Sequence, residues 1–406
     1  MDAKVNKIVI ISAYPFNQRD YLRFGVETLR DNGFFVEIWD ISTWLLKRKT
    51  ESAGGKNRFT CEDLRFFSNK NEIVSAIESM DSGCLVNCII EFSIQTFFIF
   101  SALSKKHIRY CVFGMTSFPN PYPEIPGRIR GVITVIRRAG SLKISEVVQQ
   151  FFNSILRNYY HFFGIRPAAI ILRSGERSTG NFGYPIDATT TQLWAHMLDY
   201  DIYLKNPALS GDTVQKNGVF LDDYLPLHPD HIYSGIDYAL SPDPYYQKLC
   251  SFFKTLETSL KTQVIVAAHP RSEYENLPDY FEGRLLIKGE TARLVRESAF
   301  VIAHMSTAIN FAVLYKKPIV FITNDELENL TTGKNLTGLY IRAIAAELGK
   351  KPINIDHYQS IDWNKELSVN EQKYQQYKNL YIKREGTPVK PVWEIFCDHL
   401  RSMENP

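Results

Sequence analysis

Short apolar runs alternate with amphipathic stretches along most of the chain. The runs show little alternation between faces, which is typical of strands that are buried on both sides, and the stretches between them have helical spacing of apolar residues. In the first half, strands are predicted at residues 7–15, 34–42, 84–92, 108–114 and 167–175, with helices at 20–33, 71–80, 94–106 and 141–164. This order predicts a parallel sheet with helices on both faces.

A second series of the same kind begins near residue 217. Its predicted strands are 217–223, 263–270, 283–289, 300–304, 318–323 and 352–356, and its predicted helices are 244–262, 291–299, 306–317 and 336–349. Two further helical stretches, 368–383 and 390–402, form the tail. The fold class predicted is therefore α/β, with two tandem doubly wound, Rossmann-like domains at residues 1–205 and 206–365. We expect residues 366–406 to pack back on the first domain.

Composition narrows the class of protein. A chain of 406 residues is long enough for two cores, because one core rarely grows past about 250–300 residues. The net charge of +3 does not favour nucleic acid as a partner. The six cysteines form no CxxC pair, so no zinc site is expected, and we predict neither a metal nor an organic cofactor. No secretory leader and no apolar run of about 20 residues is visible, which favours the cytoplasm.

Polar residues follow several strands of the second series. Ligands of doubly wound sheets bind outside the carboxyl ends of the strands, in this chain in the cleft expected between the two domains. The strand at 263–270 ends in His269-Pro270-Arg271, and proline directs the chain away so that the imidazole stays at the strand's end. Ser306-Thr307 follows the strand at 300–304 and is expected to open a helix, where N–H groups bind anions. A turn-capping histidine and a simple N-cap are the alternatives.

Other strand ends carry chemistry of a different kind. Lys288-Gly289-Glu290 is a loop whose glycine allows close approach of a nucleobase, and no dinucleotide or P-loop glycine motif is present. Asp222 and Asp223 end the strand at 217–223, and Asp230 and His231 follow shortly after. An aspartate in this position can accept a proton or attack an anomeric carbon. We assign Asp223 to the turn and favour Asp230, then Asp222, for catalysis.

The first domain contributes candidates for binding an acceptor. The segment 173–181, RSGERSTGN, follows a strand, is basic and polar and contains glycine. It suits an anionic acceptor or a carboxylate-bearing sugar, and a solvated loop is the alternative. The substrate-binding candidates are Arg173, Ser174, Glu176, Arg177, His196 and Asp199. Residues 125–144 contain five Lys/Arg and no acid, and could contact anionic lipid or form a solvated basic face.

These motifs together resemble a known group of enzymes. Tandem α/β domains with His269-Pro270 at one strand end and Ser306-Thr307 after another resemble the sialyltransferase-like glycosyltransferases of GT-B fold. The segments FLDDYLPLHPD and HMLDYD resemble more closely the retaining β-Kdo transferase modules of bacterial O-antigen and capsule synthases. The resemblance covers roughly residues 167–324.

The resemblance implies a function and assigns roles to residues. The donor would be a CMP-activated acidic sugar, CMP-Kdo, whose phosphate His269, Ser306 and Thr307 would hold. An aspartate would attack the anomeric carbon with overall retention, and we place it on Asp230. The acidic motif of sialyltransferases with a following glycine is absent from LDDY, which favours the retaining mechanism.

The expected partners follow from this function. They are a lipid-linked glycan acceptor at the inner face of a bacterial inner membrane and other transferase modules of the same synthase. Two alternatives remain open. One is a UDP-sugar epimerase or polyol-phosphate transferase with the same fold, and the other is a non-catalytic module that binds a nucleotide sugar or glycan.

Overall fold

Two parallel β-sheets account for the apolar runs of the sequence. The computed structural model describes residues 4–46, 59–115, 119, 121, 144–208, 216–228, 240–330, 336–358 and 360–404. The chain divides into two units, each of which is considered by itself. Unit 1 comprises Met1–Thr116, Lys143–Leu198 and Lys383–Pro406, and unit 2 comprises Ser117–Leu142 and Asp199–Ile382.

The sheet of unit 1 has the strand order β3-β2-β1-β4-β5-β6-β7, with every pair parallel. Its strands are β1 (Lys7–Ser12), β2 (Phe35–Asp40), β3 (Leu64–Phe66), β4 (Cys84–Ile89), β5 (Arg109–Gly114), β6 (Ile170–Arg173) and β7 (Thr191–Trp194). Its helices are α1 (Gln18–Arg23), α2 (Val26–Asp31), α3 (Ser42–Leu46), α4 (Lys70–Glu78), α5 (Phe97–Lys105), α7 (Ile144–Asn158), the 3₁₀ turn η1 (Tyr160–Phe163) and α17 (Val392–Glu404).

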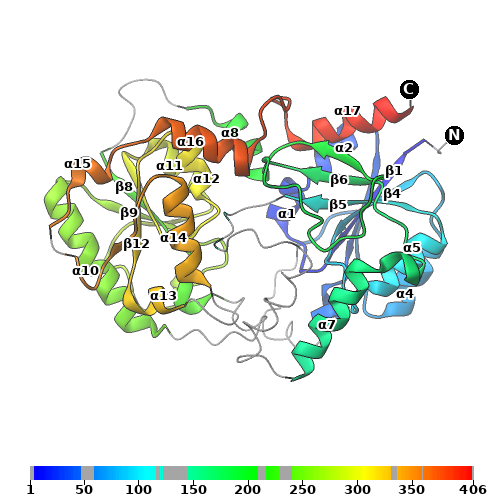
Figure 1. The fold of residues 1–406 in the computed structure, drawn as a ribbon, viewed down its shortest axis with the longest axis horizontal. Coiled ribbons are helices and arrows are strands. Elements are labelled where there is room, and N and C mark those ends of the chain that lie inside the picture. The colour runs from blue at the N-terminus through cyan, green and yellow to red at the C-terminus, as the bar shows by residue number, and fades with distance from the viewer. Residues whose placement is uncertain are drawn as a thin grey trace. The chain divides into compact units, whose positions relative to one another are not determined.

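Both faces of this sheet are buried, as Figure 1 shows by the helices on either side. In β1, Val9 and Ile11 belong to one apolar cluster and Ile8 and Ile10 to another, because successive side chains point to opposite faces. Ile8 pairs with residues of both β2 and β4, so β1 is central. Apolar and polar residues do not alternate along these strands because both faces of the sheet are buried, as predicted.

Unit 2 has a sheet of order β10-β9-β8-β11-β12-β13, again with every pair parallel. Its strands are β8 (Gly218–Leu221), β9 (Val264–Ala268), β10 (Leu286–Lys288), β11 (Phe300–Ala303), β12 (Ile319–Thr323) and β13 (Ile353–Asn354). Its helices are α8 (Leu198–Lys205), α10 (Pro242–Leu260), α11 (Thr291–Glu297), α12 (Ile309–Leu314), α13 (Asp325–Asn329), α14 (Thr337–Glu347), α15 (Trp363–Glu366) and α16 (Glu371–Tyr377), with short turns η2 (Leu225–Leu227) and η3 (Tyr274–Asn276) and the π-turn η4 (Lys378–Ile382).

The longest helix of unit 2 shows how sequence sets an element. Helix α10 begins after Ser241 with Pro242 in its first turn, where the missing N–H costs no hydrogen bond. It ends at Lys261, which adopts the left-handed conformation. Its apolar face packs with that of α14 against one side of the sheet, around Phe220. The two Rossmann-like units confirm the predicted fold class.

The structure differs from the predicted boundaries in three respects. The boundary between the units lies at Leu198 and not at residue 205. Of the tail expected to pack on the first domain, residues 366–382 belong to unit 2, and only residues 383–406 belong to unit 1. Strands β3 and β7 were not predicted, because three or four partly polar residues give no periodic signal. The helix expected at 20–33 is broken at Gly25, which has φ +61° and leaves room for Trp393. Among the described residues, no helix is long and apolar enough to cross a bilayer.

Candidate functional site

The carboxyl ends of β8, β9 and β11 gather the polar residues of unit 2. Strand β8 lies between β9 and β11, and the chain winds outward from β8 in one direction and from β11 in the other. Such a reversal is the topological switch point of a doubly wound sheet, where ligands bind. Asp222 follows β8, His269 follows β9 and His304 follows β11. The sheet order thus brings together strand ends that are far apart in the sequence.

Asp222 holds the loops at this edge in place. It is 4% exposed, and its carboxylate accepts the N–H of Tyr224 at 2.9 Å, the N–H of His269 at 3.2 Å and the hydroxyl of Tyr274 at 3.0 Å. Burial raises the pKa of Asp222 to about 6, although these three hydrogen bonds oppose the shift. The side chain predicted as a reserve nucleophile is therefore a clamp between β8 and the His269 turn.

Asp223 is the more exposed acid of the pair. Its carboxylate accepts the N–H of Met305 at 3.0 Å and the hydroxyl of Ser306, so it ties β8 to the loop after β11. Burial raises the pKa of Asp223 to about 7, and the nearby charge of Asp222 adds to the shift. A carboxyl group with this pKa can hold or release a proton near neutral pH. The sequence pattern assigns Asp223 to a turn, so this residue is not among the catalytic candidates predicted from the sequence.

His269 has a defined orientation at the end of β9. Its Nδ1 accepts the N–H of Arg271 at 3.2 Å, while its own carbonyl accepts the hydroxyl of Ser272 at 2.7 Å. Because Nδ1 is an acceptor, a neutral ring carries its proton on Nε2, which is then a donor. The ring of His228 lies edge-on to that of His269 with centroids 4.6 Å apart. Pro270 and Arg271 are exposed.

The histidine at the end of β11 has a structural role. His304 is fully buried between the hydroxyl of Tyr245, 2.9 Å from Nε2, and the carbonyl of Ile322, 2.8 Å from Nδ1. Burial lowers the pKa of His304 to about 4, so the ring stays neutral. It supports the switch point from beneath the loop that carries Ser306.

The helix expected to open at Ser306 begins three residues later. Turns precede α12, in which the N–H of Ile309 bonds to the carbonyl of Ser306 at 3.1 Å and that of Asn310 to the carbonyl of Thr307 at 3.1 Å. The hydroxyl of Ser306 is engaged with Asp223, and Thr307 is exposed. The hydroxyl of Ser306 also accepts the N–H of Ala308 at 3.4 Å, so the capping alternative stays open for Ser306.

The remaining candidates of unit 2 lie apart from this centre or outside the described part of the chain. Lys288, Gly289 and Glu290 follow the edge strand β10, and Gly289 has φ +86° with open space beside it. Lys288 pairs with Glu275 at 3.8 Å, and Glu290 forms an ion pair with Arg293. Pro229, Asp230 and His231 fall outside the described residues, so the preferred nucleophile stays a prediction.

In unit 1, Arg173 ends β6 and is fully buried. Its Nη1 donates to the carbonyls of Ser178 and Gly180, which shapes the loop that follows. Burial lowers the pKa of Arg173 to about 10, so it stays charged at neutral pH. Among the described residues, its Nε and the hydroxyl of Ser174 are buried without a hydrogen-bond partner. Glu176 and Arg177 are exposed on the same loop.

His196 and Asp199, both predicted to bind substrate, take part in internal contacts. His196 is fully buried, and its ring nitrogens lie 3.0 Å from the carbonyl of Met197 and 2.7 Å from that of Lys390. Asp199, in unit 2, accepts a hydrogen bond from Asn310 at 3.0 Å. His196 fastens the returning C-terminal chain to unit 1, and Asp199 joins α8 to α12.

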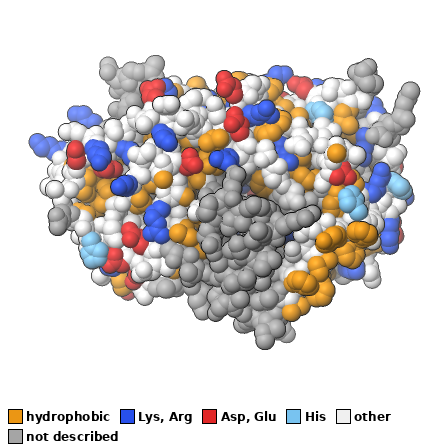
Figure 2. Space-filling model, viewed as in Figure 1, with side chains coloured by type: hydrophobic (Ala, Val, Ile, Leu, Met, Phe, Trp, Pro, Cys, Tyr) orange, Lys and Arg blue, Asp and Glu red, His pale blue; other side chains and the backbone are white. Residues whose placement is uncertain are grey.

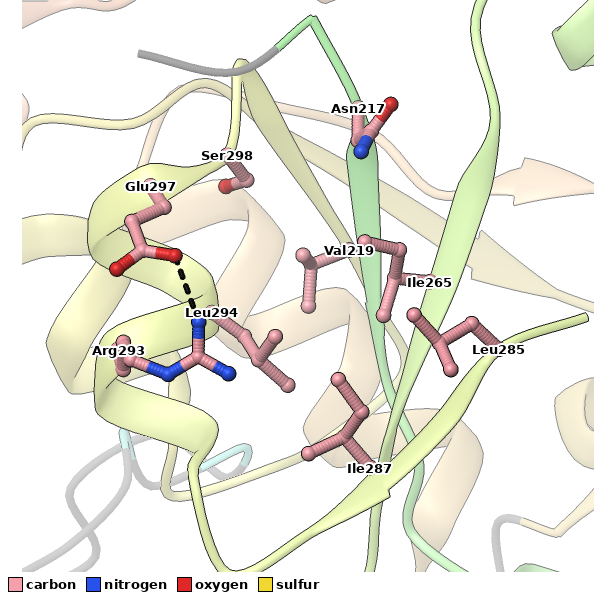
Figure 3. Close-up of a pocket in the computed structure, with 9 residues that line it drawn as sticks. All are labelled: Asn217, Val219, Ile265, Leu285, Ile287, Arg293, Leu294, Glu297 and Ser298. Carbon is pink, nitrogen blue, oxygen red and sulfur yellow. Dashed lines mark hydrogen bonds and ion pairs between the residues drawn. The ribbon is translucent and has the colours of Figure 1, made fainter. Parts of the chain in front are cut away.

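One cavity of unit 2 lies away from the switch point. It has a volume of about 220 Å³ and lies between α11 and the strands β8, β9 and β10. Figure 3 shows aliphatic side chains on the strands facing Arg293 and Glu297, which form an ion pair at 2.8 Å. No predicted site residue lines it. No cluster of His, Cys, Asp or Glu that could hold a metal occurs in the described ranges.

Comparisons with known proteins show similarity to solved structures at the level of overall architecture only. No protein-family model and no curated protein matches this sequence. Among solved structures, a glycosyltransferase of kitacinnamycin has a TM-score of 0.49 and 9% identity over the whole of both chains. MurG of Acinetobacter baumannii has 0.45 and 8%, over 98% of this chain and 100% of that one. UDP-GlcNAc 2-epimerase of Methanocaldococcus jannaschii has 0.45 and 9%, over 98% and 99%. Similarity at this level carries no argument about activity, and the fold rests on the two sheets themselves.

Proposed function

We propose that this protein is a glycosyltransferase that moves Kdo, or a related acidic sugar, from a CMP-activated donor to a glycan acceptor. The observation that carries the proposal is the gathering of His269, Asp223 and Ser306 at the switch point of unit 2. An imidazole donor, a proton-exchanging carboxyl group and a hydroxyl within one strand-end cluster suit a sugar phosphate. The motifs that resemble β-Kdo transferases support the choice of donor.

In this proposal, His269 binds the donor phosphate. Its Nε2 donates when Nδ1 accepts from Arg271, and phosphate oxygens are strong acceptors. The exposed Arg271 and Thr307 add a charge and a hydroxyl to the same edge. The open space beside Gly289 lets the base approach the backbone of Lys288 and Glu290.

The chemical step is proposed to be a double displacement. An aspartate attacks the anomeric carbon and releases CMP, and an acceptor hydroxyl then displaces the aspartate, so that configuration is retained. Asp230, with His231 beside it, remains the proposed nucleophile. Asp222 is proposed to position His269, and Asp223 to exchange the proton of the acceptor hydroxyl.

The acceptor side of the proposal concerns unit 1. The buried Arg173 shapes the loop after β6 through the carbonyls of Ser178 and Gly180, and Glu176 and Arg177 are exposed on it. An anionic, lipid-linked glycan would suit this loop, and the enzyme would then work at the cytoplasmic face of an inner membrane beside other transferase modules. Transfer to such an acceptor needs no resident metal or cofactor in this proposal.

A thermal-shift titration tests the donor class. The full chain is heated with CMP, UMP, UDP or GDP, with and without magnesium. A ligand that binds only the folded state stabilises it by about 2.7 kcal/mol at 100 times its dissociation constant. Stabilisation by CMP alone, independent of magnesium, supports the proposal and leads to transfer assays with CMP-Kdo. Stabilisation by UDP favours the epimerase-type alternative, and binding of CMP without any transfer favours a non-catalytic module.

A further inference from the structure

One surface of unit 1 exposes an unusual number of large apolar side chains. They lie within 16 residues on α7 and η1, and Phe162 is 87% exposed while Phe151 is 59% exposed. We call this surface the aromatic face, and it consists of Val148, Phe151, Phe152, Tyr159, Phe162 and Phe163. Figure 2 shows a continuous hydrophobic band where α7 lies in Figure 1. Contiguous apolar surface of this kind marks an interaction site.

The C-terminal end of α7 and the start of η1 are anchored in the core of unit 1. Leu156 and Tyr160, four residues apart, are buried in the core of unit 1. The exposed residues Val148, Phe151 and Phe152 recur at spacings of three and four, so they form a stripe along the helix. Leu156 is the only residue of α7 that the structure describes as buried, so Val148, Phe151 and Phe152 stay exposed.

Contacts to neighbouring elements fix the ends of this stripe. Phe163 lies against Phe97 of α5 with ring centroids 6.2 Å apart. The side-chain oxygen of Asn153 accepts the N–H of Ile94, itself exposed, at 2.9 Å. The aromatic face is therefore held in place by contacts with the rest of unit 1.

Charge distinguishes what can cover this face. The described residues of the segment that holds α5, α7 and η1, 92–115, 119, 121 and 144–175, contain six Lys/Arg and one acid, a net charge of +5, while the whole chain carries +3. Of the described residues, Lys105, Lys106 and Arg166 are exposed, and the guanidinium of Arg166 contacts His107 at 2.8 Å. Helix α7 itself contains one acid, Glu146, and Glu91 pairs with Arg157 at 3.7 Å.

A second copy of the chain would bring the same positive segment to the interface, and like charges repel. An anionic lipid surface supplies both an apolar layer for Phe and Tyr and a negative potential for Lys and Arg. Tyr rings settle at the level of the head groups and Phe rings at the boundary with the acyl chains, which suits one Tyr and four Phe on this face. The combination favours lipid over protein.

We propose that α7 and η1 form a membrane-contacting surface, which places the aromatic face in the head-group region of a bilayer that contains anionic lipid. The proposal stands apart from sugar transfer, because it rests on exposure and charge in unit 1 alone. The attachment it describes is peripheral, through one face of α7 and η1.

Vesicle flotation with the full chain tests the proposal. Vesicles are pure phosphatidylcholine or contain about one-third phosphatidylglycerol, at about 0.1 M and about 0.5 M salt. The test variant is F151S/F162S, and the matched control is L22S/L285S, which removes two apolar side chains that are also exposed (67% and 59%) but lie elsewhere. Circular dichroism and the CMP thermal shift accompany each variant, so that loss of folding or of nucleotide binding is recognised separately.

Wild type and the control are expected to float with anionic vesicles and to bind phosphatidylcholine at least about tenfold more weakly. F151S/F162S is expected to lose about tenfold or more in partitioning while remaining folded. Higher salt is expected to weaken binding several-fold. The Debye length is about 10 Å at about 0.1 M and shorter at about 0.5 M, so the attraction between Lys or Arg and anionic lipid is screened more strongly. Wild type that ignores both vesicles, or a variant that binds as wild type does, overturns the proposal. A dimer in light scattering that F151S/F162S dissolves, without lipid binding, assigns the face to a second copy.

Discussion

Substitution of Gly25 by Ala probes how the last helix packs on unit 1. Gly25 separates α1 from α2 and has φ +61°. A Cβ atom there would lie 2.2 Å from Cδ1 and 2.3 Å from Cγ of Trp393, far inside contact distance. Trp393 is 2% exposed, and its Nε1 donates to the carbonyl of Arg23 at 2.9 Å. The ring therefore cannot move away without giving up this hydrogen bond and its packing on α2.

The expected cost has two parts. A left-handed conformation costs a residue with a Cβ about 1–2 kcal/mol, and overpacking of a closed core costs about 1–3 kcal/mol. We therefore expect Gly25→Ala to lower the free energy of unfolding of unit 1 by about 3 kcal/mol. Gly33 is a matched control, because it has φ +87° and nothing lies within 4 Å of its ideal Cβ. Gly33→Ala should cost only about 1 kcal/mol.

Urea unfolding, followed by circular dichroism and tryptophan fluorescence, measures both variants. A double-mutant cycle with Trp393→Ala isolates the clash, because the cost of Gly25→Ala should fall to about 1 kcal/mol once the ring is gone. Equal costs for Gly25→Ala and Gly33→Ala would refute the reasoning. So would a cost for Gly25→Ala that is unchanged by Trp393→Ala.

Three further predictions concern the candidate site. His269→Ala should weaken CMP binding by about 10- to 100-fold in calorimetry, since a hydrogen bond to a charged group contributes about 1.5–3 kcal/mol; unchanged affinity would remove His269 from the site. Asp223, whose pKa is raised to about 7 by burial, binds its proton more tightly in the folded state, so the stability it provides is present below about pH 4 and lost as pH rises through about 7. Wild type should therefore lose about 2 kcal/mol more than Asp223→Asn between about pH 5 and about pH 7 in urea titrations, and parallel profiles would contradict this. Arg173→Met should leave the carbonyls of Ser178 and Gly180 without this donor and lower the free energy of unfolding by about 2–3 kcal/mol. Arg177→Met, on the exposed part of the loop, should change it by less than about 0.5 kcal/mol. Equal effects of the two substitutions in thermal unfolding would contradict the structural role of Arg173.

The two adjacent acids at the end of β8 bond to different loops. Successive side chains leave a strand on opposite sides, so Asp222 turns toward the β9 loop and Asp223 toward the β11 loop. Asp222 bonds to the N–H of His269, and Asp223 bonds to the N–H of Met305. The pair thereby couples the imidazole of His269 to the loop that carries Ser306.

Sequence reasoning located this edge of the sheet and missed its internal contacts. His269, Ser306 and Asp222 were recognised because each follows an apolar run, and parallel strands end at one edge. Tyr274, which donates to Asp222 at 3.0 Å, gave no signal, because it lies on a short turn 52 residues away. His196 and Asp199 were expected to bind substrate, but their partners are Lys390 and Asn310, which no local pattern reveals.

The sequence by itself determined the class of fold, because burial of a parallel sheet on both faces requires continuous apolar runs separated by helical periodicity. It also determined the number of Rossmann-like units and the strand ends at which polar residues collect. Tertiary structure alone decided which of those residues face one another and which are sealed inside. The orders β9-β8-β11 and β2-β1-β4 depend on pairing between strands that are far apart in the chain. The pKa values of Asp222 and Asp223 depend on burial by those pairings, and burial is a property of the packed molecule.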